Sequence, residues 1–143
     1  MSEKNVMTAR SEAIVREFIH AWDSRDLEGA MALLSRDIVY INQPLEPIVG
    51  LLAIRRIIKA LMEQCVSVEF KLLNLFGNGS RVCTERLDCW DFDGSGIALR
   101  LPCVGMFDVN ADGKISGWRD YFDNQYWTAH GGPTLEPTDY ITD

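Results

Sequence analysis

Three charged side chains, Arg86, Asp88 and Asp120, stand within segments that alternate like β-strands. Because successive side chains of a strand point to opposite faces, Arg86 and Asp88 share one face with Trp90. Asp120 shares its face with aromatic neighbours two residues away on either side. A charge among aromatic side chains is costly to bury unless it is paired, so these faces indicate an enclosed pocket. Two carboxyl groups and a guanidinium in such a pocket are the components of a general acid–base site.

Each of these residues also has a simpler interpretation. Arg86 and Asp88 could form an exposed ion pair on a sheet, and Asp120 could be a surface carboxylate beside an arginine. Tyr40 and Asn42 lie two residues apart on an early extended segment and could be ordinary hydrogen-bonding core residues. No GxGxxG, P-loop or HExxH motif is present, and the two histidines are isolated. The sequence therefore predicts no cofactor and no metal site.

Length and charge limit what such a site could serve. The 143 residues are the size of one domain, so we expect a single domain over 1–143. The net charge of −7 disfavours nucleic acid and anionic membranes as partners. The first residues lack the apolar run of a signal peptide and no segment reaches transmembrane length, so we expect a cytoplasmic protein. The four cysteines show no CxxC spacing, which favours buried free thiols.

The first half of the chain is predicted to be mainly helical. Apolar residues recur at helical spacing from about 8 to 22. Asp26 is a plausible N-cap for a short second helix whose apolar face runs from Leu27 to Leu34. An extended segment over 39–43 stops at a proline, and Gly50 then opens a third helix.

After residue 66 the apolar period changes from that of a helix to two. Strands are predicted over 66–76, 81–92, 97–109 and 114–123, separated by turns rich in Gly, Asn and Asp. Helices first and strands second is an α+β pattern. We expect a curved antiparallel sheet packed with the N-terminal helices into a cone with one deep pocket. The two ends, 1–7 and 130–143, are predicted to be flexible or to wrap the surface.

Taken together, three motifs resemble the limonene-1,2-epoxide hydrolase family. They are Tyr40-x-Asn42-x-Pro44, Thr84-Glu85-Arg86-Leu87-Asp88 and the segment 113–123 that contains Asp120. The resemblance covers nearly the whole chain and includes Gly105-x-Phe107 in the penultimate strand. It implies the cone-shaped fold shared with nuclear transport factor 2, scytalone dehydratase and ketosteroid isomerase, also called SnoaL-like. A fold alone does not imply a function, so the set of polar residues carries the functional part of the resemblance.

The resemblance also implies a role for each polar residue. Asp120 would be the general base that removes a proton from water, and Tyr40 and Asn42 would hold that water. Asp88 would be the general acid that protonates the epoxide oxygen, and Arg86 would bridge the two aspartates. The implied partners are a small-molecule epoxide and water, with no cofactor, and a second copy of the chain in a homodimer.

The predicted function is a cofactor-independent epoxide hydrolase that converts small apolar epoxides, cyclic or short-chain, to vicinal diols in one step. The expected substrate-binding wall comprises Ile19, Trp22, Ile58, Cys65, Trp90, Leu101, Cys103, Trp118 and Phe122. Trp22 and Trp90 are bulkier than the aliphatic residues of the family, so the chemistry is easier to carry over than the substrate. Two alternatives remain open: a polyketide-cyclase- or ketosteroid-isomerase-like enzyme, and a non-catalytic protein that binds hydrophobic ligands.

Overall fold

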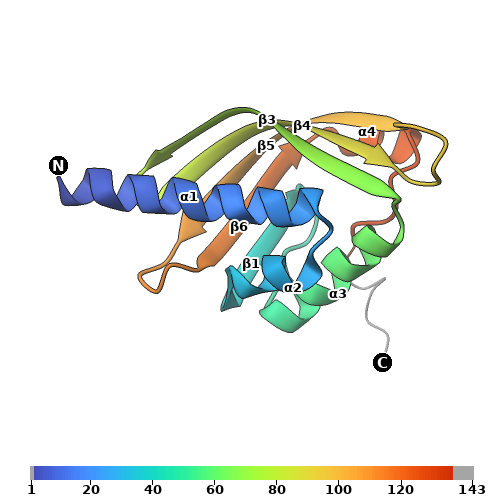
Figure 1. The fold of residues 1–143 in the computed structure, drawn as a ribbon. Helices are drawn as coiled ribbons and strands as arrows, with labels where there is room; N and C mark the ends of the chain where they lie inside the picture. The colour runs from blue at the N-terminus through green and yellow to red at the C-terminus, as the bar shows by residue number, and fades with distance from the viewer. Residues whose placement is uncertain (1, 137–143) are drawn as a thin grey trace.

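A computed structural model describes residues 2–136 of the chain, and these form an α+β domain (Figure 1). Within this range the strands build one six-stranded sheet in the order β2-β1-β6-β5-β4-β3. The elements in chain order are α1 (Glu3–Asp23), α2 (Leu27–Ala32), β1 (Leu34–Gln43), β2 (Ile48–Val49), α3 (Leu51–Glu63), β3 (Ser67–Asn78), β4 (Arg81–Asp91), β5 (Leu99–Val109), β6 (Ile115–Phe122) and α4 (Asn124–Ala129).

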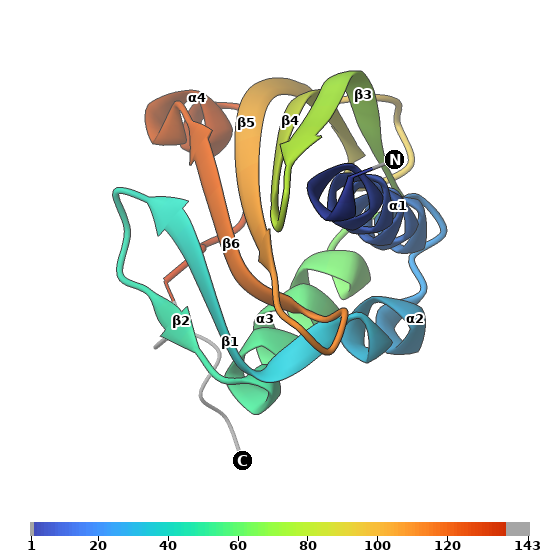
Figure 2. The ribbon, with the colours of Figure 1, turned by 90° about the vertical axis from the view of Figure 1, so that its left-hand side faces the viewer.

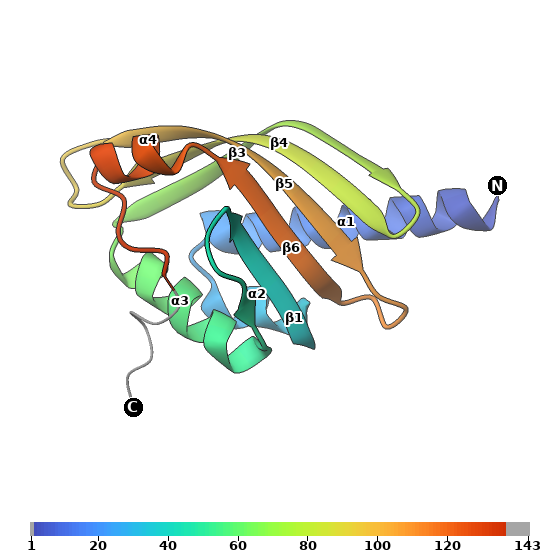
Figure 3. The ribbon, with the colours of Figure 1, turned by 180° about the vertical axis from the view of Figure 1, so that it is seen from behind.

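The sheet is strongly curved and its concave side is closed by helices, as predicted. Figure 2 shows the strands bending in an arc around α3, with α1 lying along the β3 and β4 side. The view from behind shows α4 near the end of β6 (Figure 3). Side chains on the concave face of the sheet and on the inner faces of the helices form the core. A cavity between them can therefore be lined by both strands and helices.

The predicted antiparallel meander is confirmed for β3 to β6. The chain adds one parallel pair, because β1 lies beside β6 with Leu34 opposite Ile115 and Asn42 opposite Asp120. The strand begins at Leu34, earlier than predicted, and the expected placement of Leu34 on the second helix is wrong. The backbone of Ile115 donates to Leu33, and Ile38 is fully buried, so pairing and burial favour a strand here.

Two helices also differ from the expectation. α1 begins at Glu3, because the Ser2 side chain caps it by accepting from the backbone of Asn5. α4 was not predicted. Its N-cap is Asp123, whose carboxylate accepts from the backbone amides of Gln125 and Tyr126. The described part of the predicted C-terminal end folds back onto the domain, with Leu135 buried. Met1 and 137–143, which complete the two predicted flexible ends, lie outside the described residues.

Aromatic side chains dominate the core beneath the site. Phe18 of α1 meets Phe107 and Trp118 edge to face, with ring centroids 6.0 and 5.0 Å apart. The four cysteines are free thiols, as predicted. No helix among residues 2–136 is both long and apolar enough to cross a membrane. This aromatic packing fixes the inner faces of β5 and β6, and β6 carries Asp120 of the site.

Candidate active site

Arg86 lies at the centre of a buried ion cluster and is 1% exposed. Its Nε and Nη2 donate to Oδ1 and Oδ2 of Asp88, each over 2.9 Å. Its Nη1 and Nη2 donate to Oδ1 and Oδ2 of Asp120 over 3.2 and 3.1 Å. One guanidinium therefore holds two carboxylates, each in a two-point contact. The interpretation of Arg86 and Asp88 as an exposed surface pair is excluded.

The remaining contacts of Arg86 fix its plane. Nη1 donates to Thr84 Oγ1 over 3.0 Å and Nη2 to Cys103 Sγ over 3.1 Å. The guanidinium carbon lies 4.8 Å from the ring centroid of Phe70. Gly105 supplies the necessary space, since a Cβ there would overlap Nη1 and lie 2.8 Å from Asp120 Oδ1 and from Thr84 Oγ1.

Sheet register explains why these side chains meet. Asp88 on β4 stands opposite Phe70 on β3 and Leu101 on β5, all facing the concave side. Gly105 on β5 stands between Thr84 on β4 and Asp120 on β6. The two-residue alternation that placed Arg86 and Asp88 on one inner face is confirmed, and pairing with β5 brings Asp120 to them.

The parallel pairing of β1 with β6 brings Tyr40 and Asn42 to the same place. Asn42 stands opposite Asp120, and Tyr40 opposite Trp118. The Tyr40 hydroxyl donates to Asn42 Oδ1 over 2.9 Å, and its ring stacks on Trp118 at 3.7 Å between centroids and 11° between planes. Asn42 Nδ2 is buried and has no hydrogen-bond partner among residues 2–136. This amide donor is therefore available to a ligand beside Asp120.

Trp118 has a different place from the one predicted. It is 1% exposed and does not line the cavity. Its Nε1 donates to Asp120 Oδ1 over 2.8 Å. The expectation that Trp118 contacts substrate is therefore wrong: it packs behind Asp120 and holds that carboxylate from the core side.

The protonation of Asp88 is set by its surroundings. Burial raises the pKa of Asp88 to about 6, the Arg86 charge and hydrogen bonds oppose this, and the Asp120 charge adds to it. Burial also raises the pKa of Tyr40 well above its ordinary value, so its hydroxyl keeps its proton. Burial alone would lower the pKa of Arg86, but Asp120 and Asp88 outweigh it and keep the guanidinium charged. The cluster thus pairs a permanent cation with a carboxyl group that can carry a proton near neutral pH.

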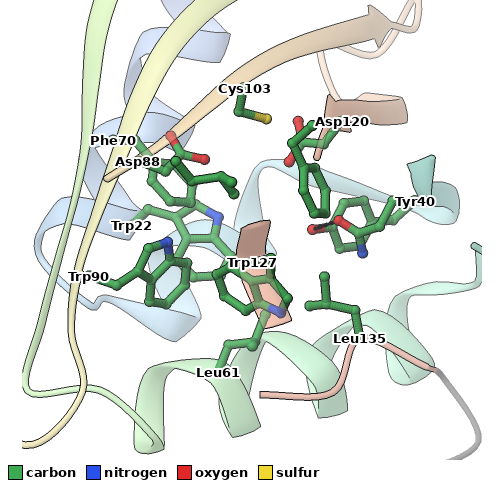
Figure 4. A pocket seen from close by; sticks show the side chains of 13 residues that line it. Trp22, Tyr40, Leu61, Phe70, Asp88, Trp90, Cys103, Asp120, Trp127 and Leu135 are labelled. Atoms are coloured by element: carbon green, nitrogen blue, oxygen red, sulfur yellow. Dashed lines mark hydrogen bonds between the residues drawn. The ribbon is translucent and has the colours of Figure 1, made fainter. Parts of the chain in front are cut away.

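The carboxylates open into an enclosed cavity of about 30 Å³ (Figure 4). This space is enough for about two water molecules, so a substrate needs the covering side chains to move. Arg86 lies behind the carboxylates and does not line the cavity. The residues that do are Trp22, Tyr40, Asn42, Leu61, Phe70, Asp88, Trp90, Leu101, Cys103, Asp120, Phe122, Trp127 and Leu135.

The apolar wall was predicted in part. Trp22, Trp90, Leu101, Cys103 and Phe122 line the cavity as expected. Three further predicted residues are buried in the core and do not reach it: Ile19, Ile58 and Cys65. The apolar stripe of a helix covers a wide arc, and only part of that arc faces the cavity. The stripe therefore predicted that Ile19 and Ile58 point inward, but not that they stop short of the cavity.

Four cavity residues were missed. Leu61 lies on the same stripe of α3 as Ile58, and Phe70 is adjacent to Asp88 across the β3–β4 pair, so both had a detectable signal. Trp127 and Leu135 come from α4 and the segment after it, and their only signal was an apolar side chain in a polar stretch. Together they cover one side of the cavity (Figure 4).

Comparison with known proteins identifies the family of the chain. Residues 9–129 match the model of the limonene-1,2-epoxide hydrolase catalytic domain. The chain belongs to this family. Epoxide hydrolase EphG of Mycobacterium tuberculosis is 32% identical over 109 residues, which cover 76% of this chain and 70% of EphG. The family assignment makes this chain a homologue of an epoxide hydrolase.

Solved structures agree with the family and show how widely the fold is shared. A Mycobacterium tuberculosis epoxide hydrolase described as similar to limonene-1,2-epoxide hydrolase superposes with a TM-score of 0.72 at 30% identity, covering 86% of this chain and 90% of that one. A SnoaL-like protein from Shewanella denitrificans superposes with a TM-score of 0.75 at 16% identity, covering 84% and 95%. The second match shows the fold alone.

Proposed function

We propose that this member of the limonene-1,2-epoxide hydrolase family adds water to small apolar epoxides, cyclic or short-chain, in one step without a cofactor. The observation that carries the proposal is the cluster in which Arg86 holds Asp88 and Asp120, with the unpaired Asn42 amide beside Asp120. This arrangement supplies a base, an acid and a water-holding donor at one end of an apolar cavity.

In the proposed reaction, Asp120 removes a proton from a water that Tyr40 and Asn42 hold. The water oxygen forms a bond to one epoxide carbon while the bond from that carbon to the ring oxygen breaks. Asp88 gives its proton to the departing oxygen, and the product is a vicinal diol. Afterwards Asp120 carries a proton and Asp88 does not, so proton exchange must restore the starting state. Positioned acid and base groups each contribute roughly 100- to 10,000-fold.

The environment suits this division of roles. An acid must be neutral before the reaction, and burial keeps the pKa of Asp88 near 6. A base must be oriented toward the water, and Asp120 is held by Arg86 and Trp118 from two directions. The apolar wall excludes bulk water and favours a hydrocarbon body over a charged one.

An isomerase or cyclase on the same fold would use Asp120 to remove a proton from carbon and a second group to stabilise an enolate. The fold shared with a SnoaL-like protein keeps this reaction available as the alternative. A non-catalytic ligand-binding protein is a third class. The buried Arg86 cluster argues against it, because placing three charges in an apolar wall is costly and unnecessary for binding a hydrophobic ligand.

We also propose that the chain acts as a homodimer through the outer face of the sheet. Val104 and Tyr121 are neighbours across the β5–β6 pair and are 38% and 47% exposed, and Phe76 on β3 is 61% exposed. Sedimentation equilibrium should give twice the mass of the chain. A monomer at all concentrations would refute this assembly.

Hydrolysis of cyclohexene oxide, measured against a blank without enzyme, tests the proposed activity most directly. A single turnover in ¹⁸O-water should place the label in the diol and none in the protein. Label in an aspartate carboxyl group after later turnovers would indicate a covalent ester and refute the one-step path. Absence of any diol above the blank, with several small epoxides, would refute the activity itself.

A further inference from the structure

Two tryptophans of the cavity wall carry indole N–H groups that no protein atom accepts. Trp22 on α1 and Trp90 on β4 are 1% and 4% exposed. Their Nε1 atoms have no hydrogen-bond partner among residues 2–136. The other two tryptophans have partners: Trp118 donates to Asp120 over 2.8 Å and Trp127 to the backbone of Pro133 over 2.7 Å. Both unpaired indoles line the cavity, and both paired ones bond to oxygen.

These two donors lie close to the acid–base cluster. Trp90 is two residues after Asp88 on the same face of β4, and the rings of Trp22 and Trp90 meet edge to face with centroids 6.0 Å apart. Figure 4 shows both indole nitrogens on the side of the cavity where Asp88 lies. A small ligand group beside Asp88 would therefore lie near the indole nitrogens of both Trp22 and Trp90.

A buried donor without an acceptor destabilises the state that contains it, and an indole nitrogen can only donate. The complementary ligand group is therefore a hydrogen-bond acceptor. An anionic acceptor is disfavoured, because Asp120, the proposed base, lines the same cavity and would repel it. A neutral oxygen, as in an ether, a carbonyl or a hydroxyl group, fits both the donors and the charge.

We infer that the preferred substrates are small epoxides that carry a second, neutral oxygen near the epoxide ring, and that this oxygen accepts hydrogen bonds from the indole N–H groups of Trp22 and Trp90. The inference rests on the proposed epoxide hydrolysis and refines its substrate class from purely apolar to mono-oxygenated epoxides. The hydrocarbon part of such a substrate contacts Leu61, Leu101 and Phe122, while the second oxygen points to the α1 and β4 wall.

The test compares two epoxides of the same size and symmetry, cyclopentene oxide and 3,4-epoxytetrahydrofuran, in which one CH₂ is replaced by an ether oxygen. The measured quantity is the ratio of kcat/KM for the ether to kcat/KM for the carbocycle. Differences in intrinsic reactivity cancel when this ratio is compared between variants. Trp22→Phe and Trp90→Phe should each lower the ratio by about 10-fold, the effect of one lost hydrogen bond. Tyr126→Phe is the control, because it removes a polar group from an aromatic side chain of α4 that does not line the cavity, and it should leave the ratio unchanged.

A second measurement uses the unchanged protein, so its result does not depend on whether the tryptophan variants fold. The indole N–H signals in a ¹⁵N NMR spectrum are recorded with trans-tetrahydrofuran-3,4-diol and with trans-cyclopentane-1,2-diol, the two products. The signals of Trp22 and Trp90 should move downfield with the ether diol and less with the carbocycle.

The two levels of the proposal fail in different ways. If neither epoxide is hydrolysed, the proposed function and this refinement both fall. If both are hydrolysed with ratios that the Trp22 and Trp90 variants do not change, the activity stands and the refinement is wrong. Indole N–H groups that face aromatic rings or a retained water would give that second result.

Discussion

The indole Nε1 of Trp118 donates to Oδ1 of Asp120 over 2.8 Å, from the side of the carboxylate opposite the cavity. The same oxygen accepts from Arg86, so Asp120 is held by one donor from its own strand β6 and one from β4, on the far side of β5. Trp118 is in turn stacked on Tyr40, the residue that orients Asn42. One indole therefore contacts both Asp120, the proposed base, and the ring of Tyr40, whose hydroxyl is proposed to help hold the water.

Trp118→Phe tests this positioning role. The change keeps an aromatic ring near Tyr40, removes the donor to Asp120 and reduces the volume of a buried side chain. We expect kcat to fall by about 10- to 100-fold with KM little changed, because the base is misoriented while the wall is intact. A change in KM alone, or a loss of activity that follows only from a lower Tm, would contradict it.

Replacing the acid–base residues should show that they act as a unit. Asp120→Asn, Asp88→Asn and Arg86→Ala should each lower turnover by at least about 100-fold, since each removes a proton-transfer or bridging role. Any pair combined should cost far less than the product of the single effects. Steady-state rates, with circular dichroism to confirm folding, measure this. A folded Asp88→Asn variant with near-normal turnover would remove the assignment of Asp88 as the acid.

The pH dependence follows from Asp88, whose pKa burial raises to about 6. The acid is protonated below this pH and ionised above it, so kcat/KM should be half-maximal near pH 6 and fall about 10-fold per unit beyond it. Asp88→Asn should lack this limb in its residual activity. The same shift means that the folded state binds the proton more tightly than the unfolded state, whose pKa is near 3.8. This contribution to the free energy of unfolding is full below pH 3.8 and is lost as the pH rises through 6.

Gly105→Ala should disable the site by steric overlap alone. The added Cβ would overlap Nη1 of Arg86, which is too enclosed by Thr84 and the aspartates to move away. Overpacking of this kind costs about 1–3 kcal/mol in the free energy of unfolding, and displacement of Arg86 should lower kcat by at least about 100-fold. Urea unfolding and turnover of the variant, both compared with the unchanged protein, measure the two effects. Full activity in the folded variant would mean that Arg86 tolerates a shift.

Trp90→Ala should change selectivity while keeping the acid and the base. Trp90 lines the cavity two residues beyond Asp88, so its removal enlarges the wall where the ring of the substrate lies. We expect larger cyclic epoxides to gain rate relative to small ones, and the attacked carbon to change. The product enantiomeric ratio and the relative rates for a small and a large cyclic epoxide measure this. If neither changes, Trp90 does not contact the substrate.

The parts of the fold that alternation controls could be predicted from the sequence. The inner face of β4, with Arg86, Asp88 and Trp90, follows from period two and from a turn that fixes the strand's start. The apolar stripes of the helices could also be predicted, but a stripe does not show which of its residues reach the cavity. Ile58 and Leu61 share one stripe of α3, and only Leu61 reaches the cavity.

Other parts of the fold could not be predicted, because the segments that pair or pack together are far apart in the sequence. Parallel pairing of β1 with β6 joins residues almost 80 positions apart, with no local turn to announce it. α4 is six residues long, too short for an apolar repeat, and its one signal is the N-cap Asp123. Leu135 is apolar in a polar stretch, and only the folded chain shows that it covers the cavity.

The position of β6 has a consequence for biosynthesis. Among residues 2–136 it is the last strand in chain order, yet in the sheet it lies between β1 and β5. Until it arrives, both neighbours present open hydrogen-bonding edges, and an open edge is a template for aggregation. A chain cut after residue 114 would keep every helix that precedes the meander and still carry those two edges. The sheet is therefore complete only once β6 inserts between β1 and β5, and the same strand brings Asp120, the proposed base, to the site.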